Sequence, residues 1–137
     1  MIEFINNPDQ INEARVKLML NSSASFFQVL IQRLVYSFVS KEKMLDLNKK
    51  FLNHNTDTDI ITFPYGTDKI IISEVFISSN QAIENATQNN QSAENEIVRL
   101  VSHGFLHSIG FQDKTEDDKR KMSSQEDMMI NMFHVKQ

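Results

Sequence analysis

Two apolar segments rich in β-branched and aromatic residues, 34–39 and 69–77, constrain the fold of this chain most. Such residues favour strands, and each segment is followed by a serine that can cap a helix. Ser40 precedes a helical pattern that reaches about Phe51, and the serines after the second segment precede another. The order of these patterns predicts strands that alternate with helices, as in an α/β or α+β domain.

The rest of the chain supplies further strands and helices. Segment 59–63 stops at Pro64 and turns through Gly66 toward 69–77, which is typical of two strands paired as a hairpin. The other predicted elements are a strand over 1–5, a turn at Pro8 and Asp9, a helix over 11–20 whose end near Ser22 to Ser25 stays open, a helix from Ser92 to Gly110, and a helix from Thr115 through Met132. We expect a single domain over residues 1–137.

Composition excludes several kinds of chemistry. The chain has no cysteine, so thiolate metal sites and thiol nucleophiles are ruled out, and any metal must be held by histidine and carboxylates. The first residues lack the pattern of a signal peptide and no segment resembles a membrane span, so we expect a cytoplasmic protein without membrane contact. A net charge of −4 gives no bulk attraction to nucleic acid, so a role on RNA needs another basis.

One pair of histidines carries the chemistry. His103 and His107 are four residues apart on a predicted helix, so both imidazoles project from one face about 6 Å apart. Asp113 follows the turn that Gly110 permits, and two histidines with a carboxylate are a ligand set of catalytic zinc and non-haem iron sites. Such a pair also arises by chance in surface or core positions. Gly104, inside the helix, indicates a close approach of another element, and it stands where zinc proteases need a glutamate base.

Residues 103–113 read His-Gly-Phe-Leu-His-Ser-Ile-Gly-Phe-Gln-Asp and resemble the signature of the YbeY endoribonucleases, His-Gly-x-Leu-His-Leu-x-Gly-Tyr-Asp-His. The three histidines of that signature bind zinc. The resemblance therefore implies that His103 and His107 are ligands of one divalent metal ion, zinc, and that Asp113 is the third ligand by position. Aspartate is a competent zinc ligand, so the substitution preserves a site.

The resemblance continues outside the signature, from Leu34 to Glu126. It rests on Leu47, Asn48 and Phe51, on Thr58-Asp59-Ile60-Ile61-Thr62-Phe63, on segment 73–78, and on Met122 and Glu126. Outside the signature, two departures from the family bear on function. Leu52 stands where many members carry an arginine near the cleft, and Ser73 replaces a glycine, which concerns a turn or a close approach.

Together with the predicted elements, the resemblance implies an α/β (α+β) domain with a small, mixed, four-stranded sheet covered by helices and a metal site in an edge cleft. It implies a single-strand-specific, metal-dependent endoribonuclease of rRNA maturation and ribosome quality control, with rRNA and ribosomal components as partners and no DNA. Glu126 and Asp59 are candidates for assisting the metal-bound water. The alternatives are a metallohydrolase of peptides or small molecules, and a non-catalytic ribosome-assembly factor that contains metal.

Other side chains have weaker assignments. Thr58, Asp59 and Thr62 either line the cleft or satisfy backbone groups at the start of a strand. Met122 packs in the core, and we expect it beneath the metal site. His54 and His134 are assigned no role. A possible basic rim, which can equally be solvated surface charge, consists of Lys49, Lys50, Lys69, Arg99, Lys114 and Lys119.

Overall fold

The computed structural model describes residues 1–7, 11–52 and 58–135, without the side chain of Leu52. The predicted turn at Pro8 and Asp9, and His54, lie outside the described residues, as does the side chain at the family's arginine position. The elements are β1 (Ile2–Ile5), α1 (Glu13–Phe27), β2 (Leu30–Val39), α2 (Lys41–Leu52), β3 (Ile60–Pro64), β4 (Ile70–Ser78), α3 (Ser79–Gln88), α4 (Ala93–Ser108) and α5 (Glu116–His134).

The four strands form one mixed sheet in the order β1-β2-β4-β3. β1 and β4 each run parallel to β2, whereas β3 runs antiparallel to β4 with Ile61 opposite Phe76. The predicted hairpin and the predicted mixed sheet are therefore confirmed. β3 is an edge strand, and its free edge is where the candidate site lies.

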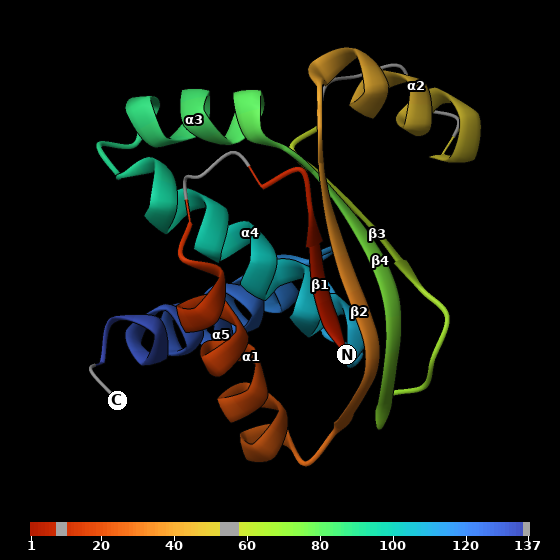
Figure 1. Ribbon diagram of the computed structural model, residues 1–137, viewed down its shortest axis with the longest axis vertical. Helices are drawn as coiled ribbons and strands as arrows, with labels where there is room; N and C mark the ends of the chain where they lie inside the picture. Colours follow the sequence, from red (N-terminus) through yellow and green to blue (C-terminus); the bar gives the residue numbers. More distant parts are fainter. Residues whose placement is uncertain (8–10, 53–57, 136–137) are drawn as a thin grey trace.

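Helices cover the two faces of the sheet unequally (Figure 1). α1, α3, α4 and α5 lie on one side, where alternate residues of the central strands, such as Tyr36 and Val75, are buried in the main core. The Tyr36 hydroxyl donates a 2.8 Å hydrogen bond to the Val101 carbonyl and so fixes α4 against β2. α2 packs on the other face, where Met44 and Leu47 cover Ile61. The result is an α+β fold.

Helix α1 is longer than the helix that the sequence predicts over 11–20. α1 continues through the serines at 22, 23 and 25 to Phe27, and Gln28 ends it in the left-handed conformation with φ 57°. Serine is a poor helix former in isolation, but Ser23 is fully buried and its hydroxyl donates to the sulfur of Met132 in α5. Tertiary packing therefore decides the end of this helix. Among the described residues, no helix has the length and apolarity needed to cross a bilayer.

Candidate metal centre

α4 carries the two histidines, and its ends are fixed by local interactions. The Ser92 side chain accepts a hydrogen bond from the Asn95 amide, and Glu94 and Glu96 lie in the first turn, where acids suit the helix dipole. Gly110 follows the last turn with φ +107°, a conformation that glycine adopts readily. The predicted stop at Gly110 is confirmed, and the chain reverses there toward Asp113.

Gly104 marks the close approach that the sequence predicts. A Cβ atom at this position would lie 3.0 Å from Val75 Cγ1 and 3.5 Å from Thr62 Oγ1. The partner is therefore the sheet itself, since Val75 belongs to β4 and Thr62 to β3. Without a side chain at Gly104, α4 lies directly on these strands, and the face with His103 and His107 comes to the edge at β3.

The three predicted ligands meet in space. His103 Nε2 and His107 Nε2 each lie 3.3 Å from Asp113 Oδ2, and one ligand atom from each residue lies within 4.8 Å of the others. Ligands at 2.0–2.1 Å around a tetrahedral zinc ion are about 3.3 Å apart, so this donor set fits such an ion. Within the described part of the chain, these residues are the one group of this kind.

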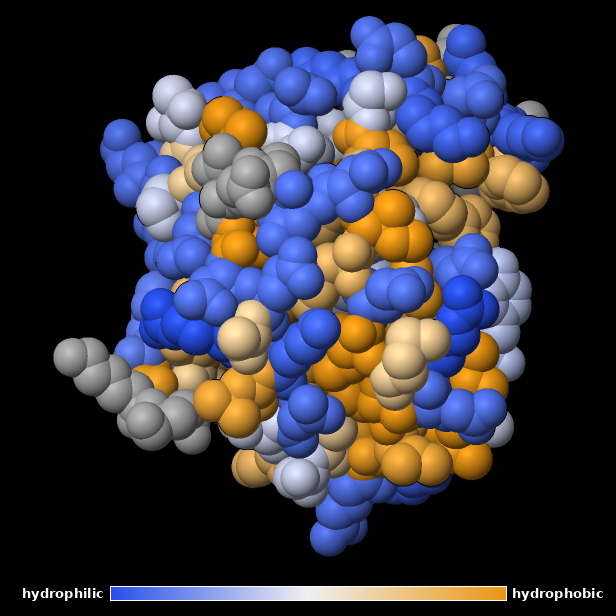
Figure 2. Space-filling model, in the orientation of Figure 1, coloured by the Kyte–Doolittle hydropathy of each residue, from blue (hydrophilic) through white to orange (hydrophobic). Residues whose placement is uncertain are grey.

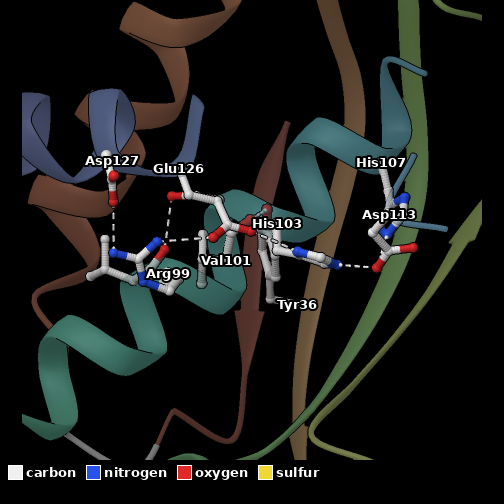
Figure 3. A network of polar contacts seen from close by, with 10 residues as sticks. Tyr36, Arg99, Val101, His103, His107, Asp113, Glu126 and Asp127 are labelled. Carbon is white, nitrogen blue, oxygen red and sulfur yellow. Dashed lines mark hydrogen bonds and ion pairs between the residues drawn. The ribbon is translucent and has the colours of Figure 1, made fainter. Parts of the chain in front are cut away.

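A second layer of contacts orients His103 (Figure 3). Glu126 Oε2 in α5 lies 2.7 Å from His103 Nδ1, and Glu126 Oε1 accepts a 2.9 Å hydrogen bond from Arg99. Arg99 also donates to Asp127 Oδ1 at 2.8 Å. Because Nδ1 faces Glu126, the Nε2 atom of His103 is directed toward Asp113. A carboxylate behind a histidine in this way is typical of metal-ligating histidines.

The same contacts set the proton affinity of His103. Burial lowers the pKa of this imidazole, but the hydrogen bond and the charge of Glu126 raise it by more, with smaller contributions from Asp113 and Asp59. The net effect places the pKa above its ordinary value. Protons therefore compete with a metal ion for the imidazole of His103 more strongly than they do for a solvated histidine.

The histidines open into a cleft of about 760 Å³ beside the edge of β3. Thr58, Asp59 and Thr62 line it, and the Thr58 hydroxyl also donates a 3.2 Å hydrogen bond to the Ile60 carbonyl, so both predicted alternatives hold for Thr58. Buried Met122 also lines it. Asp59 Oδ2 accepts a hydrogen bond from Asn85 in α3.

Several predicted side chains lie elsewhere. Of the predicted basic rim, Arg99 and Lys119 line the cleft, and the cleft-lining residues do not include the lysines at 49, 50, 69 and 114. His134, which was assigned no role, lies at the far end of α4, where its Nε2 atom is 2.7 Å from Asn95 Oδ1.

Sequence reasoning missed the contacts of Arg99 and Ser73 and the place of Glu96 in the cleft. Arg99 is the ion-pair partner of Glu126. The one signal in the sequence was its position four residues before His103, which places both side chains on the same helical face. Glu96 also lines the cleft, where burial and then Asp59 raise the pKa of its carboxyl. Ser73 lies within β4, so its replacement of glycine concerns a close approach and no turn: its hydroxyl is 2.7 Å from that of Ser108.

The fold and the site define a class: an α+β domain in which one helix and the turn after it present two histidines and a carboxylate to an open cleft. The family model described as Endoribonuclease YbeY matches residues 3–134. The chain belongs to the YbeY endoribonuclease family.

Two relatives agree with this membership, and one solved structure shares the fold. The Endoribonuclease YbeY of Flavobacterium johnsoniae is 41% identical over 102 residues, 74% of this chain and 73% of the relative. The Endoribonuclease YbeY of Christiangramia forsetii is 30% identical over 135 residues, 98% of this chain and 92% of the relative. A solution structure of a Thermotoga maritima protein shares the fold, with a TM-score of 0.66 at 19% identity over 97% of this chain and 89% of that one. The predicted resemblance is confirmed.

Proposed function

We propose that this protein is a metal-dependent endoribonuclease that hydrolyses single-stranded RNA in rRNA maturation and ribosome quality control. One observation carries the proposal: His103, His107 and Asp113 converge with the spacing of metal ligands at the wall of an open cleft. Family membership supports RNA as the substrate, and cytoplasmic ribosomal components as the partners.

We propose zinc as the metal, held by His103 Nε2, His107 Nε2 and Asp113 Oδ2. When bound with an open position, such an ion lowers the pKa of a coordinated water and polarises a phosphoryl oxygen. The chain's own contribution is orientation. Glu126 orients the ring of His103 through Nδ1, and Arg99 in turn holds Glu126 in place through an ion pair.

The two candidates for proton transfer differ in their surroundings. Both oxygens of Glu126 are engaged, one by Arg99 and one by His103, which supports a positioning role for this carboxylate. Asp59 is half-buried at the cleft wall, and its Oδ2 atom accepts the hydrogen bond from Asn85. Asp59 is therefore the better candidate to accept a proton during hydrolysis.

The test combines metal analysis with cleavage assays on protein purified without an affinity tag. We expect one metal ion per chain in the parent protein, a large loss in Asp113→Ala, and cleavage of single-stranded RNA but not of the same sequence as DNA. Cleavage of a peptide substrate instead would support a different metallohydrolase. A His107→Ala variant that loses metal but retains every ribosomal phenotype would identify a non-catalytic assembly factor.

A further inference from the structure

The cleft itself offers little positive charge to an RNA strand. Its two lining cations are Arg99 and Lys119, and Arg99 is already paired with Glu126 and Asp127. The carboxylates that line it are Asp59, Glu96, Asp113 and Glu126. Because binding of nucleic acid depends on neutralising phosphates, the backbone on either side of the scissile bond needs cations outside this cleft.

The end of α2 presents such cations beside an exposed aromatic ring. Phe51 is 57% exposed, and the Nζ atom of Lys50 lies 5.7 Å from the centre of its ring, within cation–π range. Lys49 and Lys50 are exposed in the last turn of the helix, and within the described residues neither forms an ion pair. An exposed ring next to exposed lysines is the composition of single-strand binding surfaces.

This end of α2 is connected to the cleft through the edge strand. The ring of Phe51 contacts Phe63 edge-on, at 5.6 Å between centroids and 77° between planes. Phe63 lies in β3 between Thr62 and Pro64, which both line the cleft. α2 therefore lies one side chain away from the cleft wall, on the other face of the sheet. At the upper right of Figure 2, where α2 lies in Figure 1, hydrophilic surface gathers next to apolar surface.

We propose that Phe51, Lys49 and Lys50, here called the α2 platform, bind the RNA strand as it leaves the metal cleft across the edge of β3. Phe51 stacks on one unpaired base, and the two lysines neutralise the adjacent phosphates. The contact with Phe63 limits the motion of the ring before the base arrives, which reduces the entropy lost on binding. This inference rests on the proposed function and names where its substrate is held.

The test compares two fluorescent single-stranded RNAs, a trinucleotide that fits the cleft alone and an RNA of about 12 nucleotides, within the site sizes of single-strand binders. Binding is measured by anisotropy on the full chain with His107→Ala to prevent cleavage, and KM and kcat are measured on the metal-loaded enzyme. We expect Phe51→Ala to weaken binding of the longer RNA by about five-fold or more and to raise its KM, with kcat and trinucleotide binding unchanged. Phe51→Trp restores binding.

The matched control is Phe26→Ala. Phe26 is 61% exposed and contacts Phe27 edge-on at 5.0 Å, but it lies at the end of α1 and does not line the cleft. Lys49→Ala with Lys50→Ala should reduce the salt dependence of binding by a slope of about 0.7 for each lost phosphate contact. If Phe51→Ala binds both RNAs as Phe26→Ala does, the platform is wrong. If the parent enzyme cleaves no RNA, the proposed function fails, while the binding measurements still decide the platform.

Discussion

Removal of the carboxylate behind His103 is the sharpest test of how this centre is built. Glu126→Ala deletes the acceptor 2.7 Å from His103 Nδ1, so the ring loses its fixed orientation and its added basicity. Loss of such an outer partner lowers metal affinity by about 10- to 100-fold, equivalent to about 1.4 to 2.8 kcal/mol. We expect this loss for zinc, with His107 and Asp113 still in place.

The assay is a competitive titration of zinc against a chelator of known affinity at fixed pH. Asp127→Ala is the matched control, because Asp127 binds the same Arg99 from the outside and is 64% exposed. An exposed pair contributes about 0 to 1 kcal/mol, so zinc affinity should stay near the parent value. Glu126→Gln, which keeps an acceptor but no charge, should fall between the two. Equal zinc affinity in Glu126→Ala and the parent would refute the orienting role.

Three further predictions concern the same centre. Gly104→Ala should lower the free energy of unfolding by about 1 kcal/mol in urea titration, because crowding against Val75 at 3.0 Å outweighs the gain in helix propensity. An added Val75→Ala should recover part of the loss, and an unchanged or higher stability of the single variant would contradict the close contact. Asp113→His should retain zinc binding in isothermal titration and Asp113→Ala should lose it; equal affinities would exclude Asp113 as a ligand. In the metal-free protein, the raised pKa of His103 adds stability that is complete below about pH 6.5 and is lost as pH rises through the folded pKa. Melting temperatures from pH 5 to 8 should show this decline in the parent and a smaller one in Glu126→Gln.

The sheet and most helices could be predicted because their signals are local. β-branched runs, serine caps and the glycine at 110 each act within a few residues, and the elements found agree with them. The end of α1 could not be predicted, because Ser23 is helical through its burial against α5, far away in the sequence. The start of β2 at Leu30 depends in the same way on its pairing with Ile70.

In the candidate site, too, the features set by local sequence could be predicted and those set by packing between helices could not. The spacing of His103 and His107 places two predicted ligands on one helical face, and the turn at Gly110 brings Asp113, six residues further along the chain, to 3.3 Å from His107 Nε2. The contact of Glu126 with His103 spans 23 residues and depends on how α5 packs on α4, which no local pattern encodes. Sequence reasoning therefore found Glu126 but could not distinguish a general base from a positioning residue.

Two departures from the family pattern, Ser73 outside the signature and Ser108 within it, lie in contact with each other. Ser73 stands for a glycine and Ser108 for a leucine, and both serines are buried where β4 meets α4. Ser108 donates its hydrogen to the Gly104 carbonyl at 2.8 Å, so the 2.7 Å contact between the hydroxyls needs Ser73 as the donor. The hydroxyl of Ser73 depends on Ser108 as its acceptor, because a lone buried hydroxyl at 73 has a desolvation cost of about 1 to 3 kcal/mol. The smaller side chain at 108 also leaves room for the hydroxyl at 73, so the close approach of α4 to the sheet, which brings the predicted metal ligands to the cleft, is retained through the contact between the two serines.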